Sequence, residues 1–449
     1  MSNTLKEETK HQLLVPFREA LFYWFKLGFI SFGGPAGQIS MMHQEVVERR
    51  RWISEHRFMH ALNFTMVLPG PEAQQLATYI GWLMHGIKGG IAAGVLFVLP
   101  SLIILAGLTW AYLVFSDVRA VTGVLFGIKP AVTAIVAFAA YRIGRRALKN
   151  NVLMIIAAIA FTAIFVFNTP FPYIVIAAGL VGLLGSRIAP QKFQTGNNRE
   201  GQEKTDGAAV IDDDTPVPVH ARFNLRHSVV ITAISLFLWG GALAWIAAAY
   251  GWEGTLTQMG WFFTKAALVT FGGAYAVLPY VYQGGVEYYA WLTTSQMIDG
   301  LALGETTPGP LIMIVAFVGF VGGWTKEIFG PGLLHLAGIA GACTATLFTF
   351  FPSFLFIFLG GPLVEATRHE IRFTAPLTGI TAAVVGVILN LAVFFAYHVL
   401  WPSGFKGGFE WFSFFLGLAS FIALARYKAG IATVIIACAA LGMIYIFYL

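Results

Sequence analysis

The chain has 449 residues, of which 57% are apolar and only 11% are charged, and its mean hydropathy is +0.73. Soluble globular domains carry about 25% charged residues, so this composition excludes an ordinary soluble protein. The formal net charge of +6 resides mostly in short loops between apolar runs, where the orientation signals of membrane proteins lie. We therefore expect no nucleic-acid binding.

The N-terminal 17 residues are polar and charged, and they lack the order of regions that marks a cleaved secretory signal. Apolar stretches long enough to span the hydrocarbon core of a bilayer then recur, for example at residues 90–114, 121–141, 328–359 and 373–397. Many aromatic residues stand at the ends of such stretches, as in the interfacial belts of membrane proteins. We predict an all-α polytopic membrane protein that lies in a lipid bilayer.

One pattern occurs twice in the chain. Two Gly-rich or Pro-rich breaks and the tryptophan between them recur 239 positions later: Phe32-Gly33-Gly34, Trp52 and Pro69-Gly70-Pro71 return as Phe271-Gly272-Gly273, Trp291 and Pro308-Gly309-Pro310. The register holds without a gap over about 45 residues. An internal duplication with breaks at matching positions in an apolar chain is typical of a secondary transporter. We therefore predict two transporter repeats built from broken helices or helical hairpins.

A polar segment separates the two repeats. Residues 189–226 are rich in Gln, Asn, Gly and Pro, and they contain three consecutive aspartates at 212–214. Such a composition predicts a solvated cytoplasmic linker. The aspartates could bind a metal ion, but a solubilising role is the interpretation that we favour. The predicted domains are a first repeat at 1–188, the linker, and a second repeat at 227–449.

Loop charges indicate that the second repeat is inverted. Residues 49–57 carry four arginines, whereas the equivalent stretch at 288–296 carries no Lys or Arg. Basic residues at 142–149 follow an apolar run of the first repeat, whereas those at 368–372 precede the equivalent run. Lys and Arg are concentrated in cytoplasmic loops, so they mark the cytoplasmic end of a helix. In matching helices of the two repeats these residues lie at opposite ends, which indicates opposite orientations.

A count of crossings gives the same result. With a cytoplasmic N-terminus and linker, the basic clusters of the short loops all fall on the cytoplasmic side, apart from the single Lys326 and Lys406. Segment 228–250 has no counterpart in the first repeat, and this one extra helix inverts the second. Each pair of broken segments returns the chain to the side where it started, whether the segments re-enter the membrane or span it. The count of crossings therefore does not fix the number of membrane-spanning helices.

The four breaks are the candidate substrate site. Freed backbone groups are tolerated in a membrane only where protein, water or ligand satisfies them, so we expect the breaks to line a protected cavity. Pro35, Pro71 and Pro310 would each begin a half-helix, whose N-terminal N–H groups suit an anion. The alternative is that the turns only reverse the chain. The glycines assigned to substrate binding are Gly33, Gly34, Gly70, Gly272, Gly273 and Gly309.

Charged and polar side chains near the breaks complete the predicted site. Lys26 and Lys265 stand six residues before the breaks and would attract an anion, unless both extend to the membrane surface. Glu72 and Glu305 would exchange protons, although either could instead pair with a lysine or cap a half-helix. Side chains that can hydrogen-bond to an oxyanion, or join helices instead, are Gln38, Gln74, Gln75, Thr306 and Thr307.

These segments resemble the chromate ion transporter family in its long, two-domain form. The resemblance rests on residues 32–38 (Phe-Gly-Gly-Pro-Ala-Gly-Gln), 69–82, 89–101, 271–279 and 300–310, and it covers both halves of the chain. It implies two homologous domains of opposite topology and export of chromate across the bacterial inner membrane, coupled to protons. Such a transporter can also be a homodimer. In the second half, Ala274 replaces the proline of the break and Leu311 replaces Glu72, so the two halves need not contribute equally.

Two alternatives to a chromate exporter stay open. Sulfate or another oxyanion would be bound by the same groups, because its shape and charge are nearly those of chromate. A membrane-embedded enzyme such as a chromate reductase would need a redox cofactor, but we find no flavin or nicotinamide fingerprint and only two cysteines, far apart. The histidines at 43, 56 and 60 lack a metal-ligand spacing, and no nucleotide-binding loop is evident. We therefore expect no cofactor, no metal and no enzymatic activity.

Overall fold

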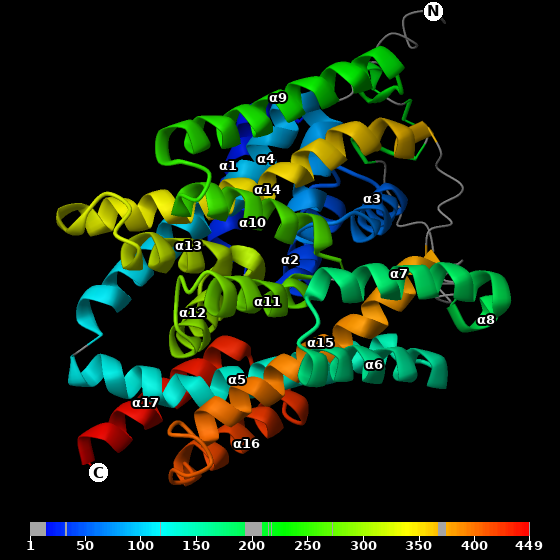
Figure 1. The fold of residues 1–449 in the computed structure, drawn as a ribbon. Coiled ribbons are helices and arrows are strands. Elements are labelled where there is room, and N and C mark those ends of the chain that lie inside the picture. The colour runs from blue at the N-terminus through cyan, green and yellow to red at the C-terminus, as the bar shows by residue number, and fades with distance from the viewer. Residues whose placement is uncertain are drawn as a thin grey trace, which may run out of the picture.

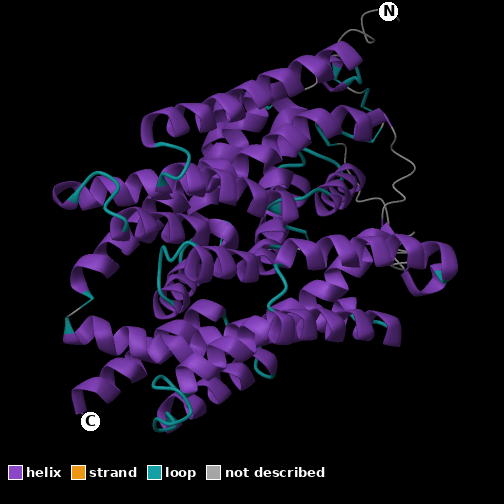
Figure 2. Cartoon of the chain, viewed as in Figure 1, coloured by secondary structure: helices purple, strands orange, loops and turns teal. Residues whose placement is uncertain are grey.

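In the computed structural model, the described residues are 15–31, 34–116, 118–193, 209–213, 215–216, 218–271, 273–366 and 374–448. The regular secondary structure of these residues is helical, apart from one isolated β-bridge between Ile53 and Ile211, and loops and turns join the helices (Figure 2). Seven of its helices are long and apolar enough to cross a membrane. The prediction of an all-α polytopic membrane protein is confirmed.

The first half of the chain contains seven long helices and one short one. They are α1 (Phe17–Ile30), α2 (Gly34–His43), α3 (Glu55–Val67), α4 (Glu72–Phe115), α5 (Arg119–Ala147), α6 (Asn151–Phe167), α7 (Phe171–Ile188) and α8 (Pro190–Phe193). A π-helical turn at Gln44–Arg49 follows α2. Helix α4 has two arms, because His85 and Gly86 leave the helical conformation.

The second half begins with the extra helix α9 (Leu225–Tyr250) and then repeats this order. Its helices are α10 (Thr255–Val269), α11 (Ala274–Tyr282), α12 (Thr294–Thr306), α13 (Ile314–Thr325), α14 (Leu334–Ala366), α15 (Thr374–Leu400), α16 (Trp411–Ala425) and α17 (Ile431–Tyr448). A π-helical turn at Gln283–Tyr288 lies 239 positions after that of the first half. Ser54 and Thr293 cap α3 and α12 in the same way, because the side chain of each accepts a hydrogen bond from the backbone N–H three residues later.

The duplication extends beyond the segments where the sequence shows it. Helices α6 and α7 begin 260 positions before α16 and α17, and the helical prolines Pro100 of α4 and Pro352 of α14 are 252 positions apart. The offset grows because the second half has longer connections around its equivalent helices. The opposite membrane orientation of the two repeats stays a prediction.

The helices form two layers, and within each layer helices of the first half pack on helices of the second half (Figure 1). The break layer contains α1–α4 and α9–α14, and the scaffold layer contains α5–α7 and α15–α17. Within the scaffold layer α5 packs on α16 and α17 of the other half, and α15 packs on α6 and α7. Helices α5 and α15 also contact each other, so neither half forms this layer alone.

Glycines allow these exchanged contacts. A Cβ at Gly127 of α5 would meet the Cys438 carbonyl and Gly442 of α17, and a Cβ at Gly379 of α15 would meet the Ala178 carbonyl and Gly182 of α7. These two contacts are equivalent, because each pairs the same positions of the repeat. Small residues at helix crossings let backbones approach closely, which is how helices associate in a bilayer.

The linker differs from the solvated segment that we expected. Ile211 donates its N–H to the Trp52 carbonyl at 3.0 Å and accepts from Ser54 N at 3.0 Å, and the Ser54 hydroxyl donates to Asp213 at 2.5 Å. The linker thereby supplies hydrogen-bond partners to backbone groups of the extended segment before α3. His220 then bonds the Trp82 carbonyl at 2.9 Å beside the α4 kink. The linker residues described between 209 and 220 are therefore docked on the break layer.

We predict that Gly442→Val lowers the thermal unfolding midpoint of the protein, and that Gly182→Val does the same. The added side chain would overlap backbone of α5 or of α15, at a cost of about 1–3 kcal/mol for overpacking. The measurement is the midpoint of thermal unfolding in detergent. Gly240→Val on α9 is the control, because no atom lies within 4 Å of its Cβ position. Equal midpoints for all three variants would contradict the exchanged packing.

Candidate functional site

The four breaks meet in two reciprocal pairs. The Gly309 N–H donates to the Ser31 carbonyl at 2.8 Å, and the Gly70 N–H donates to the Thr270 carbonyl at 2.8 Å. We call these the first junction (Ser31 with Gly309) and the second junction (Thr270 with Gly70). Each junction joins the first break of one half to the second break of the other. The freed backbone groups thus satisfy one another inside the bilayer.

Glycine is required at the centre of each junction. Gly70 has a φ of 123° and Gly309 a φ of 107°, values that residues with a Cβ rarely adopt. A Cβ at Gly309 would also lie 2.5 Å from Cβ of Ser101, and one at Gly70 would lie 2.7 Å from the Ser353 hydroxyl. The breaks therefore permit both the turn and the close approach of a second helix.

Two serines that the sequence analysis did not single out close the junctions. Ser101 follows Pro100 inside α4 and lies against the first junction, and Ser353 follows Pro352 inside α14 and lies against the second. The Gln75 amide donates to the Ser353 hydroxyl at 3.4 Å. A sequence signal existed, because the two Pro-Ser pairs interrupt equivalent apolar runs 252 positions apart.

Buried polar atoms around the junctions lack hydrogen-bond partners within the described part of the chain. They are Ser31 Oγ, Gln38 Oε1, Gln74 Oε1, Gln75 Oε1 and Ser101 Oγ. Buried polar atoms are nearly always paired, so a group of orphans marks a place where water or a polar ligand binds. Serine hydroxyls can donate to an anion, and glutamine amides can do so after rotation of the side chain.

A cavity of about 240 Å³ lies beside the first junction. Its walls come from both layers: Gly34, Gly304, Glu305, Thr307, Gly309 and Leu311 of the break layer, and Gly430, Ile431 and Ala432 at the start of α17. Four of these residues belong to the predicted site, namely Gly34, Glu305, Thr307 and Gly309. Since one water occupies about 30 Å³ of liquid, the cavity can hold a small anion together with several waters.

Glu305 is the carboxylate of this cavity. The Tyr275 hydroxyl donates to it at 2.5 Å from α11, just after the break. At the equivalent positions the first half has Met66 and Ala36, so this carboxylate and its donor exist at one junction only. A carboxylate that is held by one donor inside the bilayer can accept a proton from a cavity or release one into it.

The other predicted polar residues lie in several places. Gln38 donates to the Gly309 carbonyl at the first junction, and Gln75 donates to the Pro69 carbonyl at 2.8 Å at the second. Gln74 donates to Thr78 at 3.0 Å within α4. The Thr306 and Thr307 hydroxyls bond to carbonyls of their own helix, α12.

Gly273 lies at the break before α11, whereas Gly33 and Gly272 fall outside the described residues. Glu72 is the first residue of α4, one position after Pro71, and no described residue gives its carboxylate a hydrogen bond. A carboxylate there lies favourably at the positive end of the helix dipole. The cavity instead contains Leu311, the equivalent of Glu72 in the second half.

The two predicted lysines are not among the residues that line the cavity. Lys26 is exposed on the outer face of α1, beside the exposed Phe22 and Phe25. Lys265 is partly exposed on α10, with its amine 5.6 Å from the centre of the Trp261 ring. Extension to the membrane surface would produce these positions. A role for either lysine in attracting the anion stays a prediction.

Arg142 is the cation that the sequence analysis missed. It lies on α5 and is half-buried, and it is close enough to Glu305 and the Tyr275 hydroxyl to act on both electrostatically. Its guanidinium lies 5.8 Å from the centre of the Phe138 ring and has no recorded carboxylate partner among the described residues. The sequence grouped it with the basic loop after α5, because position along the chain does not reveal that α5 runs beside α12.

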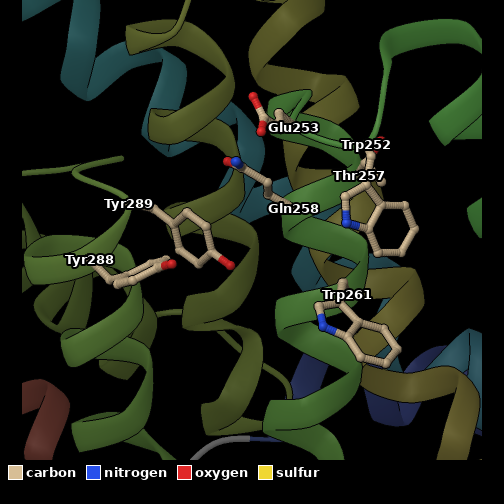
Figure 3. Close-up of a pocket in the computed structure, with 7 residues that line it drawn as sticks. All are labelled: Trp252, Glu253, Thr257, Gln258, Trp261, Tyr288 and Tyr289. Atoms are coloured by element: carbon tan, nitrogen blue, oxygen red, sulfur yellow. The ribbon is translucent and has the colours of Figure 1, made fainter.

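A larger cavity of about 500 Å³ lies elsewhere, between the start of α10 and the π-helical turn after α11 (Figure 3). Figure 3 shows Trp252 and Trp261 on one side of α10 and the tyrosines 288 and 289 on the other, with Gln258 between them. None of the four breaks lines this cavity. Its exposed aromatic rings fit an interfacial belt, so we place the candidate site at the smaller cavity.

This architecture, with broken helices paired at the centre of a duplicated helical membrane protein, defines a class of polytopic transporter folds. Comparison with known protein families identifies the family to which the chain belongs. The chromate transporter family matches residues 18–183 and 257–443, one region in each half, and the chain therefore belongs to that family.

Individual relatives agree with this assignment. The chain is 30% identical to the chromate transport protein of Cupriavidus metallidurans over 380 residues, which cover 84% of this chain and 82% of the relative. It is 32% identical to the chromate transport protein of Pseudomonas aeruginosa over 366 residues, or 81% and 77% of the two chains. No solved structure matches the chain at a significant level.

A shorter relative matches part of the chain. An uncharacterized transporter of Bacillus subtilis is 27% identical over 162 residues, which are 35% of this chain but 91% of that protein. A relative much shorter than this chain therefore aligns over nearly its whole length, as the duplication in the sequence would lead one to expect.

We predict that Gly309→Ala is strongly destabilising. The left-handed conformation costs a residue with a Cβ about 1–2 kcal/mol, and the contact with Ser101 adds to this. The change should be measured as the fall in thermal unfolding midpoint in detergent. Gly332→Ala is the matched control, because nothing lies within 4 Å of its Cβ position. If both variants unfolded at the same temperature, the first junction would not be formed as described.

Proposed function

We propose that this protein is a secondary active transporter that exports chromate from the bacterial cytoplasm. The observation that carries the proposal is the cavity beside the first junction, which Glu305 lines; orphaned polar atoms lie around the junctions, and Arg142 is close enough to act on Glu305 electrostatically. Membership of the chromate transporter family and the names of two relatives, both chromate transport proteins, support chromate as the substrate. An enzymatic role finds no support among the relatives, which are named as transport proteins.

The anion is held, in this proposal, by hydroxyl and amide groups of the first junction together with Arg142. Glycine at the breaks lets backbone N–H groups approach the anion as closely as side chains do. Arginine suits an oxyanion because its planar guanidinium offers two parallel hydrogen bonds. The second junction, with Gly70, Gln75 and Ser353, forms the equivalent part of the route that the anion takes through the protein.

Proton exchange at Glu305 couples transport to the proton gradient. A protonated Glu305 is neutral and leaves room for a dianion near Arg142, whereas the carboxylate repels the dianion and competes for the arginine. Because protonation of Glu305 changes the affinity of the cavity for the dianion, proton movement and anion movement become coupled. Glu72 is the second carboxylate that could take this role.

Alternating access comes from movement of the break layer against the scaffold layer. The cavity lies at the seam between them, since α12 forms one wall and the start of α17 forms another. We place the protein in the inner membrane with its N-terminus and linker in the cytoplasm, following the distribution of basic loop residues.

The test of this function is flux in proteoliposomes that contain only this protein. An imposed pH gradient should drive chromate accumulation, and excess sulfate should reduce it little. Sulfate flux at an equal or greater rate would instead make the protein a general oxyanion carrier. Absence of flux for both anions, with protein shown to be folded, would contradict transport by this chain alone.

We predict that Arg142→Gln raises the KM for chromate about tenfold or more, because hydrogen bonds to a charged group contribute about 1.5–3 kcal/mol. The measurement is the concentration dependence of initial flux. Arg145→Gln is the control, since Arg145 is an exposed arginine one turn further along α5 that lies over Tyr141. An unchanged KM in the Arg142 variant would remove this residue from the site.

The same assay decides the role of the two lysines. If Lys26 and Lys265 attract the anion, the Lys26→Gln/Lys265→Gln variant should reduce flux at normal membrane abundance. Parental flux in this double variant would mean that both side chains only extend to the membrane surface.

We predict that Glu305→Gln abolishes the dependence of chromate flux on the pH gradient, because an amide cannot exchange a proton. The variant should still permit downhill chromate exchange between the two sides of the membrane. Both fluxes are measured in the same proteoliposomes with and without the gradient, and Glu72→Gln serves for comparison. Retained coupling in the Glu305 variant, together with loss in the Glu72 variant, would transfer the role to Glu72.

A further inference from the structure

A second charged group, which does not line the cavity, lies inside the helical core. Asp299 of α12 is only 2% exposed. The Tyr112 hydroxyl of α4 donates to its Oδ2 at 3.0 Å, and the Lys129 amine of α5 lies 4.0 Å from its Oδ1. That Oδ1 atom has no hydrogen-bond partner within the described residues.

Lys129 contacts α12 at two points. Besides the carboxylate of Asp299, its amine donates to the Ser295 hydroxyl at 2.7 Å. Ser295 and Asp299 are four residues apart, so they lie on the same face of α12, one turn from each other. One lysine of the scaffold layer therefore fixes both the position and the rotation of this helix.

The contact joins the two layers close to the cavity. Helix α12 belongs to the break layer and carries Glu305 at its far end, six residues after Asp299, whereas α5 belongs to the scaffold layer. The other ion pairs recorded among the described residues lie within the break layer and its linker. A movement of one layer against the other would separate Lys129 from Asp299.

The contact is present in one half only. The position equivalent to Asp299 is His60 of α3, and the position equivalent to Lys129 is Thr381 of α15, whose hydroxyl bonds to its own helix at 2.7 Å. The duplicated fold thus carries a charged contact between layers beside the first junction, and it lacks the same lysine and aspartate beside the second.

We propose that Lys129 and Asp299 are positioning residues that hold α12, and with it the Glu305 wall of the cavity, against the scaffold layer in the conformation described here. Opening this pair is the step that lets the cavity change sides. A pair with one buried member suits this task, because removing Lys129 leaves the charge of the buried Asp299 uncompensated in the core, whereas removing both charges does not. The pair controls conformational exchange and does not touch the anion.

The inference rests on the proposed transport function only for its flux measurement, so the test has two parts. The first part needs no substrate. In a background without Cys343 and Cys438, the cavity residue Leu311 is replaced by cysteine, and the rate of labelling by a membrane-impermeant maleimide is measured. The Lys129→Gln/Asp299→Asn variant should change this rate at least threefold. Arg119→Gln, which removes a charge from α5 that contacts α17 within the scaffold layer, should leave it unchanged.

The second part is chromate flux in proteoliposomes. Either single variant, Lys129→Gln or Asp299→Asn, should lower the maximal flux at least tenfold with a KM within twofold of the parent, and the double variant should recover much of that loss. If the single variants fail to fold, the double variant alone still decides through its labelling rate.

Three results would overturn the inference. An unchanged labelling rate in the double variant would mean that the pair does not control the conformation. A higher KM at unchanged maximal flux would place the pair in anion binding. Losses that simply multiply in the double variant would show that the two residues act independently. If even the parent protein carried no chromate, the transport proposal would fail while the labelling result still stood.

Discussion

The structure depends on one constraint, that backbone groups released at a helix break inside a bilayer must find partners. Four breaks release such groups, and the chain satisfies them by pairing the first break of each half with the second break of the other half. The two reciprocal bonds, from Gly309 to Ser31 and from Gly70 to Thr270, tie the halves together at the centre. Everything that makes the site, from the orphaned hydroxyls to the cavity, is arranged around these bonds.

The duplicated skeleton carries different chemistry in its two halves. At equivalent positions Glu305 replaces Met66 and Leu311 replaces Glu72, so each half contributes one carboxylate, but at a different place. The cavity is recorded at the first junction, where Glu305 and Arg142 come together. Duplication thus supplied the geometry of paired breaks, and single substitutions placed the carboxylate at a different position in each half. The proposed binding of an anion and exchange of a proton at one seam would make use of this asymmetry.

The exchanged packing of the scaffold layer explains how such a seam can exist. Helices α5 and α15 each lie against the last two helices of the other half, held by contacts such as Gly127 with Gly442. These glycine contacts lie within the scaffold layer, whereas the contact to the break layer includes the less closely packed pair of Lys129 and Asp299, 4.0 Å apart. A rigid scaffold beside a charged, separable contact is the arrangement that relative movement of two layers requires.

The sequence by itself determined the helical membrane class, the duplication and the positions of all four breaks, because hydropathy and Gly/Pro spacing are local properties of the chain. It also identified Glu305, Gly34, Thr307 and Gly309, which the fold gathers around one cavity. Only the tertiary structure decided which breaks pair, since reciprocal pairing joins residues that are 200 or more positions apart. For the same reason Arg142 was invisible as a site residue, and the linker's docking on Trp52 could not be foreseen. Long-range packing makes these contacts, and composition and periodicity carry no record of it.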